Sequence, residues 1–296
     1  LKNLLCLDED RAVLCTANGT LALHAIYLFL KKRNKNIKFV SPSFTFPSCD
    51  VGLYDIDLLD IDHTYTIPLT DQNMVKYDVF IITNLFGTYP CNIRKWIERS
   101  NKYNKILIFD NASSPMTEIG GVNICNFGNF SFGSLHHTKF LGFGEGGYIV
   151  MPKEHYDEFE KILGFGFAKG VIKRKHNKYS SNYKMSDVAA AAILQQIQKY
   201  NIKEHKRIQN AIVQEIGGIS GVKPFNYFDG VIYGNLPLLY EDKVGIDIFR
   251  KSNIEAQKYY YPLVEHKNSL GLFDRIINLP LNSSLTEQEI EKIIPE

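Results

Sequence analysis

Lys139 is the residue in this sequence with the strongest case for covalent chemistry. It lies between a predicted strand, 130–132, and a turn that has glycines at positions 142, 144, 146 and 147. Glycine leaves the backbone bare, so a flat ligand could approach the lysine closely. A lysine that loses its proton can attack an aldehyde and form a Schiff base. Taken alone, a lysine is more often a solvated surface residue, and the adjacent His136 and His137 are more often structural.

A carboxylate ends an apolar segment earlier in the chain. Asp110 follows the predicted strand 105–109. Ligands of open α/β sheets bind at the carboxyl ends of the strands, so Asp110 should face the binding crevice. A carboxylate there could hold a pyridine nitrogen in its protonated form. The alternative is an aspartate that only forms a turn or caps a helix.

A Gly-Thr step opens an apolar helix near the N-terminus. Gly19 and Thr20 precede the helical pattern 20–32. The free N–H groups and the positive end of the helix dipole at such a position form a phosphate seat, to which Ser134 could add a hydroxyl. Phe46 follows another predicted strand and could stack on a ring. Ordinary helix capping and core packing remain the alternatives for these residues.

Two further segments could contact a substrate. The stretch 169–178 is rich in Lys and Arg, and Arg174 and Lys175 could receive a diphosphate. A run of charge is also typical of a solvated face. Tyr259 to Tyr261, before a proline, could form a pocket wall.

The elements that must position these residues alternate between strands and helices. This alternation predicts an α/β fold with a mainly parallel sheet. The predicted strands are 37–40, 79–83, 105–109, 130–132 and 148–151, and the predicted helices between them are 20–32, 92–100 and 153–163. Nearly all-apolar strands are expected where helices cover both faces of a parallel sheet.

A long helical pattern over 185–216, interrupted near Asn201, ends at Gly217-Gly218. We expect the main boundary there, with a large domain over 1–217 and a smaller α+β domain over 218–296. Strands are predicted in the second domain at 231–240, 259–263 and 276–279, and helices at 245–251 and from Thr286.

Composition excludes several classes of protein. The chain has 296 residues, is 45% hydrophobic and carries a net charge of +2, which argues against disorder and gives no field that would favour nucleic acid. Its longest uncharged apolar run, 21–30, is about half the roughly twenty residues of a membrane span. Five widely spaced cysteines predict neither a disulfide framework nor a zinc site. No secretion signal is recognisable, so we expect a cytoplasmic protein without nucleic-acid or membrane partners.

Five segments of the chain, which follow one another in the same order as in the family, together resemble the DegT/DnrJ/StrS family of pyridoxal-phosphate-dependent sugar aminotransferases. The family's S-G-T-x-A-L-H, P-S-F-T-F and N-Y-[RK]-M-[ST]-D patterns match 18–24, 42–46 and 182–187. Its S-F-H-x-T-K pattern, with G-E-G-G starting five residues after the lysine, matches 134–147, and its L-P-L and L-T-E-x-E-I ending matches 277–290. The resemblance implies an aspartate-aminotransferase-like (fold type I) large domain followed by a small C-terminal domain.

The resemblance implies a role for each matching residue. Lys139 would form the Schiff base and then move the proton between substrate and cofactor, while Asp110 would pair with the pyridinium nitrogen. Asn182 would reach the phosphate of a partner subunit, so that the active form is a homodimer with shared sites. The implied cofactor-binding residues are Gly19, Thr20, Phe46, Asp110, Ser113, Ser134 and Asn182.

The implied reaction is a two-stage transamination. Glutamate would leave its amino group on the cofactor, which would then aminate a nucleotide-linked keto-deoxysugar for glycan or natural-product biosynthesis. Arg174, Lys175 and Tyr261 are the candidate substrate contacts. The alternatives are an enzyme of the same fold acting on amino acids or on sugar dehydration, and a non-catalytic or truncated relative. A family branch with histidine in place of the lysine is disfavoured because Lys139 is present.

Three features depart from the family pattern. Ser113 stands where many members have Gln or His, and Asn84 stands where many have His in H-L-[FY]-G. Only nineteen residues precede Thr20, whereas several tens are usual in the family. We therefore expect altered contacts to the cofactor and a shortened N-terminal part.

Overall fold

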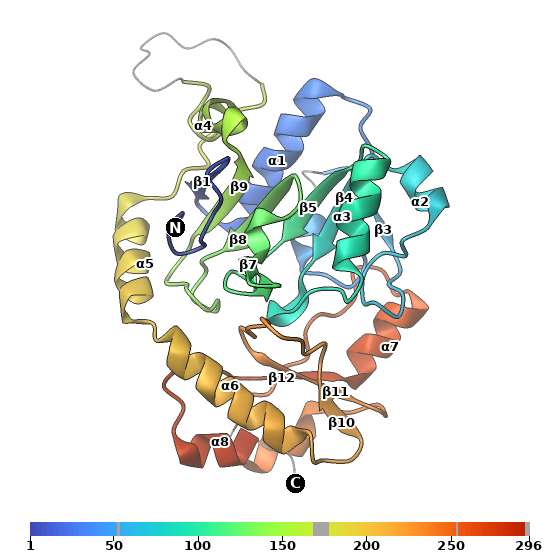
Figure 1. The fold of residues 1–296 in the computed structure, drawn as a ribbon, viewed down its shortest axis with the longest axis vertical. Coiled ribbons are helices and arrows are strands. Elements are labelled where there is room, and N and C mark those ends of the chain that lie inside the picture. The colour runs from blue at the N-terminus through green and yellow to red at the C-terminus, as the bar shows by residue number, and fades with distance from the viewer. Residues whose placement is uncertain (52–53, 168–177, 253, 294–296) are drawn as a thin grey trace.

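The computed structural model describes residues 1–51, 54–167, 178–252 and 254–293. A seven-stranded sheet lies at the centre of the larger part, in the order β1-β9-β8-β5-β4-β2-β3 (Figure 1). The strands β8, β5, β4, β2 and β3 run parallel, and β9 pairs antiparallel with both β8 and β1. Their bounds are β1 Arg11–Thr16, β2 Phe39–Pro42, β3 Ile56–Leu59, β4 Val79–Thr83, β5 Ile106–Asp110, β8 Phe130–Ser134 and β9 Gly147–Pro152. The predicted mainly parallel sheet is confirmed.

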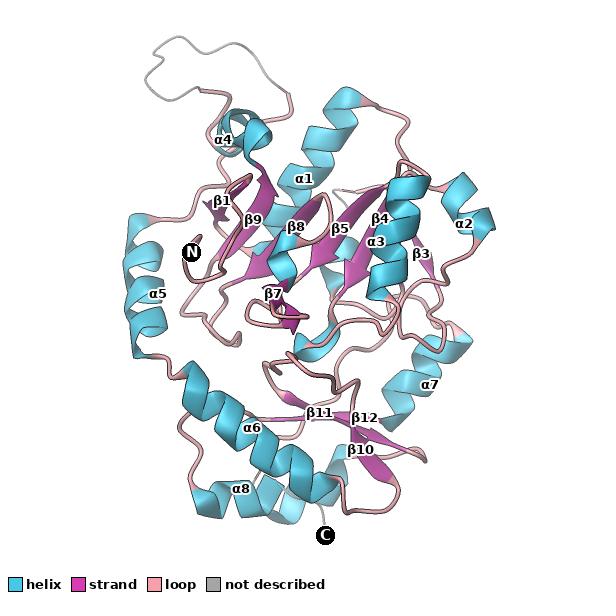
Figure 2. Ribbon diagram, in the orientation of Figure 1, coloured by secondary structure: helices cyan, strands magenta, loops and turns pink. Residues whose placement is uncertain are grey.

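Helices cover both faces of this sheet (Figure 2). In β4, Phe80 and Ile82 pack in one core cluster with Trp96 of α3 (Ile93–Lys102). Val79 and Ile81 point the other way, into a second cluster with α1 (Gly19–Arg33) and α4 (Tyr156–Leu163). Successive side chains of a strand alternate between faces, so a strand that is apolar throughout must be covered on both. A short helix, α2 (Asp71–Lys76), precedes β4.

The start of α1 is fixed by its own sequence. Asn18 has an extended backbone, and its side chain accepts a hydrogen bond from the N–H of Leu21 at 2.9 Å. This is an N-cap, which satisfies one of the donors that the first helical turn leaves free. Basic residues in the last turn complement the negative end of the helix dipole.

The predicted interruption of the long helical pattern is confirmed. Helix α5 (Asp187–Lys199) ends where Tyr200 adopts an extended backbone, and α6 (Ile202–Ile216) begins directly afterwards. Asn201 caps α6 by accepting a hydrogen bond from the N–H of Glu204 at 3.1 Å. A local capping side chain therefore restarts the helix in a new direction.

The smaller part is built on a three-stranded antiparallel sheet, β10-β11-β12. Its strands are β10 Val222–Pro224, β11 Leu236–Tyr240 and β12 Ile276–Leu279, and its helices are α7 Lys267–Arg275 and α8 Glu287–Ile293. Ile208 and Ile212 of α6 pack against Leu238 and Ile277 of this sheet. The division of the chain at residues 217 and 218 itself stays a prediction.

Several predicted elements are wrong or incomplete. Residues 259–263 form no strand, since only Gln257 bridges to Asn278 before Pro262 removes a donor. The predicted helix at 245–251 is a 3-10 turn, Ile246–Ser252, and the predicted strand at 231–240 shortens to β11. The sequence did not predict the strands β1, β3 and β10, the two-residue strands β6 (Glu118–Ile119) and β7 (Val122–Asn123), or the helices α2 and α7. Short edge elements carry too few residues to show a clear period.

Candidate active site

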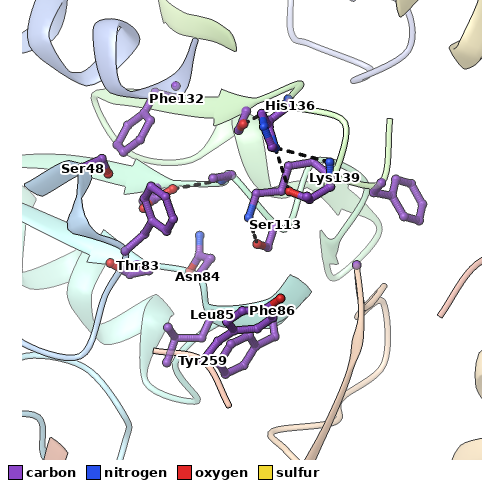
Figure 3. Close-up of a pocket in the computed structure, with 18 of the residues that line it drawn as sticks. Ser48, Thr83, Asn84, Leu85, Phe86, Ser113, Phe132, His136, Lys139 and Tyr259 are labelled. Atoms are coloured by element: carbon purple, nitrogen blue, oxygen red, sulfur yellow. Dashed lines mark hydrogen bonds between the residues drawn. The ribbon is translucent and has the colours of Figure 1, made fainter. Parts of the chain in front are cut away.

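A cavity of about 560 Å³ lies at the carboxyl ends of the parallel strands. Its volume is in the range of small-molecule binding pockets. Residues that follow β4, β5 and β8 line it, as do Gly234, Asn235, Tyr259 and Tyr260 from the smaller part (Figure 3). Of the residues predicted from sequence, the cavity brings together Gly19, Thr20, Phe46, Asp110, Ser113, Ser134 and Lys139.

Asp110 is the last residue of β5 and is almost fully buried, with 3% of its surface exposed. One carboxylate oxygen accepts a hydrogen bond from the N–H of Ala112 at 3.0 Å. Burial raises the pKa of Asp110 from 3.8 to about 6, against the opposing effects of that N–H and of the Lys139 charge. A carboxylate in this setting is stabilised by a cationic partner inside the cavity.

Lys139 lies in the turn after β8, and its ammonium group reaches into the cavity (Figure 3). Its Nζ donates a hydrogen bond to Ser113 Oγ at 3.3 Å and lies 5.8 Å from the centre of the Phe46 ring. The main chain of Lys139 is held as well, because its N–H donates to His136 O at 2.8 Å. Lys139 is therefore held in a hydrogen-bonded turn, beside the Ser113 hydroxyl and the Phe46 ring.

Two of the glycines after Lys139, Gly142 and Gly147, serve close packing of the backbone. A Cβ on Gly142 would lie 1.8 Å from His136 O, and one on Gly147 would lie 2.4 Å from the carbonyl carbon of Asn18. The turn folds back on the lysine segment through the hydrogen bond from Leu135 N to Gly146 O, 2.8 Å long. The expectation that these glycines open the backbone to a flat ligand is wrong, since they do not line the cavity.

The N-terminus of α1 forms one wall of the cavity. Asn18, Gly19 and Thr20 line it, and the first N–H groups of the helix have no acceptor within the helix. Ser134, at the end of β8, lies so close that a Cβ on Gly19 would be 3.3 Å from its Cβ. Backbone N–H groups, a hydroxyl and the helix dipole together form a site suited to a phosphate.

Gly147→Ala should disturb this candidate phosphate site by displacing the start of α1. The new methyl group would meet backbone atoms of Asn18 and Gly19, at 2.4 to 2.6 Å, and must push α1 away. We expect a loss of roughly 1–3 kcal/mol in the free energy of unfolding, measured by urea titration. Gly271→Ala, where no atom lies within 4 Å of the new Cβ, is the matched control and should be neutral or slightly stabilising. Equal unfolding curves for the two variants would contradict this account.

Phe46 presents an exposed ring to the cavity. The side chain is 46% exposed and packs edge-to-face on Tyr260, with 5.7 Å between ring centres. Its segment is tied to β4 by a 2.7 Å hydrogen bond between the hydroxyls of Thr45 and Thr83. A large aromatic ring left open on a rigid segment can stack on a flat ligand.

Other predicted site residues lie elsewhere. Asn182 is exposed, forms a bridge with Gly164 and does not line the cavity of its own chain. Tyr261 is 56% exposed and donates a hydrogen bond to Glu265, whereas its neighbours Tyr259 and Tyr260 line the cavity. The predicted wall is thus formed by the same tripeptide but not by Tyr261. Arg174 and Lys175 lie outside the described residues.

Sequence reasoning missed several lining residues. Thr83 ends β4, and Leu85 and Phe86 follow it. Glu145 pairs with His136, with 3.3 Å between Nε2 and Oε1. Asn84 follows β4 and also lines the cavity; the sequence singled it out only as a departure from the family pattern, although the rule that selected Asp110 at the end of β5 applies equally to it. Gly234 and Asn235 carried no such signal, because they come from the smaller part of the chain.

The cavity residues fit pyridoxal phosphate. A buried carboxylate, a lysine, an open aromatic ring and a helix N-terminus correspond to the pyridine nitrogen, aldehyde, ring face and phosphate of that molecule. In the part of the chain that the structure describes, no group of three His, Cys, Asp or Glu residues could hold a metal ion.

Among the described helices, none combines the length and the apolar character needed to cross a bilayer.

The fold and the cavity define an α/β protein of the aspartate-aminotransferase type. A family model matches residues 7–225, and the chain belongs to the DegT/DnrJ/EryC1/StrS aminotransferase family. The predicted family and fold are thus confirmed.

Individual relatives agree with this assignment. The chain is 26% identical to a dTDP-4-amino-4,6-dideoxy-D-glucose transaminase of Shigella dysenteriae over 231 residues, 69% of this chain and 62% of that protein. A DegT/DnrJ/EryC1/StrS aminotransferase from Brucella abortus superposes with a TM-score of 0.84 at 21% identity, covering 99% of this chain and 86% of that one. A Bacillus cereus protein described as a PLP-dependent aminotransferase superposes with a TM-score of 0.82 at 25% identity, covering 97% of this chain and 86% of that one.

Proposed function

We propose that this protein is a pyridoxal-phosphate-dependent aminotransferase that converts a nucleotide-linked keto-deoxysugar into the amino sugar. The observation that carries the proposal is the position of Lys139. Its Nζ is 3.3 Å from Ser113 Oγ, in the cavity that also holds the buried carboxylate of Asp110 and the N-terminus of α1.

The bound cofactor supplies an electron sink next to the carbon that loses or gains a proton. Asp110 keeps the ring nitrogen protonated, which maintains that sink. Gly19, Thr20 and Ser134 hold the phosphate, and Phe46 covers one face of the ring. Lys139 would hold the cofactor at its aldehyde carbon, and its amine would move the proton at the substrate carbon.

The sugar substrate and the amino donor are part of the proposal. The Shigella relative bears the name of a transaminase of a dTDP-linked deoxysugar, which supports a substrate of that class. We propose glutamate as the donor, and Arg174 and Lys175 as contacts to the diphosphate. Cytoplasmic location, and the division into a cofactor-binding part (1–217) and a smaller part (218–296), complete the proposal.

A homodimer with shared active sites also belongs to the proposal. Asn182 is exposed and does not reach the cavity of its own chain, so it is free to reach the cavity of a partner. Helix α5 follows it and exposes Val188 and Leu194, which are 82% and 56% exposed. Exposed apolar side chains on one helix support an interface with a second copy.

The absorption spectrum tests the proposed function. With pyridoxal phosphate bound, addition of glutamate alone should bleach the visible band, and addition of a nucleotide-linked keto-sugar should restore it. If the protein turns over amino acids but no keto-sugar of a panel restores the band, the result would favour the alternative, an enzyme of the same fold that does not aminate sugars. If the cofactor binds but no amino donor changes its absorption band, the result would favour a non-catalytic relative.

A further inference from the structure

His205 is a fully buried histidine of α6 that the proposed mechanism does not use. Its Nε2 lies 2.8 Å from the carbonyl oxygen of Tyr233, and its Nδ1 forms a hydrogen bond with the Tyr200 hydroxyl. A carbonyl oxygen can only accept, so Nε2 carries the ring proton and Nδ1 accepts from Tyr200. Burial lowers the pKa of His205 to about 4, so the neutral ring with both nitrogens paired persists at neutral pH.

Tyr233, which accepts from His205, leads directly into the wall of the cavity. The next two residues, Gly234 and Asn235, line the cavity. This segment precedes β11 and forms no strand itself, so no sheet partner satisfies its main chain. Gln209, one turn after His205 in α6, accepts from the N–H of Tyr233 at 2.8 Å. Both main-chain polar groups of Tyr233 are therefore bonded to side chains of α6.

The ring of His205 also packs behind the Lys139 turn. Phe140 follows Lys139 and lines the cavity. Its ring contacts the ring of His205 edge-to-face, with 4.7 Å between ring centres, and the ring of Tyr200, with 4.5 Å. His205 therefore contacts two parts of the cavity wall at once, Phe140 beside the lysine and, through Tyr233, the part that belongs to the smaller sheet.

We infer that His205 is a positioning residue, which holds the Gly234–Asn235 wall in place relative to Lys139 so that this wall can bind the keto-sugar. The inference rests on the proposed function. The residues proposed to hold the cofactor all lie in the larger part of the chain, which leaves Gly234 and Asn235 to contact the substrate. Position matters for such a wall, because a misplacement of about 1 Å can lower the rate of a reaction about a hundredfold.

Two amide variants of His205 test this role. In His205→Gln the amide nitrogen lies near the former Nε2 and can still donate to Tyr233, whereas in His205→Asn it reaches only the former position of Nδ1. Both variants lose the ring contact with Phe140 equally, so their difference reports the hydrogen bond to Tyr233. A buried carbonyl that loses its donor is costly, and we expect His205→Asn to raise the KM for the keto-sugar about tenfold. His205→Gln should stay within about twofold of the parent protein.

Steady-state assays with glutamate and the keto-sugar that best restores the visible band measure these KM values. The rate at which glutamate alone bleaches the band should be equal in the two variants, since that step does not use the sugar wall. Hydrogen exchange of the cofactor-free proteins, followed by mass spectrometry, gives a readout besides activity. The peptide that contains residues 231–235 should exchange faster in His205→Asn than in His205→Gln.

Ile212→Val is the control for a general loss of stability, because Ile212 is buried on the same helix and packs in the core of the smaller part. It should leave the KM for the keto-sugar unchanged. Equal KM values in His205→Asn and His205→Gln would overturn the inference, and so would an equal rise in Ile212→Val.

If His205→Asn does not fold, Tyr200→Phe takes its place. It keeps both rings and removes only the hydroxyl that fixes the proton on Nε2 of His205. We expect it to raise the KM for the keto-sugar about threefold, and a parental KM would contradict the role of His205. A parent protein that aminates no keto-sugar would show instead that the proposed function is wrong.

Discussion

Lys139→Ala should lower the rate of amino transfer by about a thousandfold or more. The variant loses both the amine that binds the aldehyde carbon and the group that moves the proton, and proton transfer by a placed side chain alone contributes 10²- to 10⁴-fold. Steady-state assays with glutamate and a nucleotide-linked keto-sugar measure the rate. Borohydride reduction followed by mass spectrometry should show covalently attached cofactor in the parent protein and none in the variant.

Two further variants separate this role from a general effect of losing charge. Lys139→Arg keeps the positive charge beside Phe46 but cannot bind the aldehyde, so it should be as inactive as the alanine variant. Lys95→Ala, an exposed lysine on α3, should retain full activity. A parental rate in Lys139→Ala would show that the proposed function is wrong.

Asp110→Asn should weaken binding of the cofactor and, at the same time, raise the free energy of unfolding of the cofactor-free protein. The neutral amide cannot keep the pyridine nitrogen protonated, and we expect turnover to fall about a hundredfold or more. In the empty cavity, however, the buried carboxylate is unfavourable, as its pKa of about 6 instead of 3.8 indicates. A difference of about two pKa units corresponds to roughly 3 kcal/mol at most.

The sign of the pH dependence follows from the raised pKa. Between pH 3.8 and about 6 the folded protein binds more protons at Asp110 than the unfolded chain does, so the contribution of this group to stability falls as pH rises through that window. Above it, Asp110→Asn should therefore be more stable than the parent by about 1–3 kcal/mol, and the gain should vanish near pH 4.

Urea unfolding of the cofactor-free proteins at pH 4 and pH 8 measures this difference. Asp242→Asn, at an exposed turn, is the control and should change stability little at either pH. A variant that is less stable than the parent at pH 8 would contradict the assignment of Asp110 as an unfavourably buried carboxylate. Saturating pyridoxal phosphate should reverse the order, because it binds the parent more tightly.

The residues proposed to carry the chemistry were predictable because they lie at the ends of regular elements. Asp110 ends an apolar strand, Gly19 opens a capped helix and Lys139 follows a strand, so local patterns placed each of them at the same edge of the sheet. The parallel arrangement then required these ends to meet. For the same reason the break at Asn201 was predictable, since a capping side chain acts within its own turn.

Other features depend on contacts between distant segments. Tyr260 lines the cavity and Tyr261 does not because the loop packs on Phe46 and Phe86, 174 residues or more away in sequence, and no local pattern distinguishes the three tyrosines. The glycines at 142 and 147 accommodate the backbones of His136 and Asn18, which only the folded turn brings close.

The sequence by itself determined the class of fold and the family, and it singled out the residues proposed to bind a phosphate, a pyridine nitrogen and an aldehyde, because residue type, strand ends and helix caps are local properties. Only the tertiary structure decided that Asp110 is buried enough to raise its pKa, that Asn182 lies outside its own cavity and that the amide oxygen of Asn84 is buried with no partner among the described residues. Burial and hydrogen-bond pairing are set by which distant segments pack together, and a linear pattern does not contain that information.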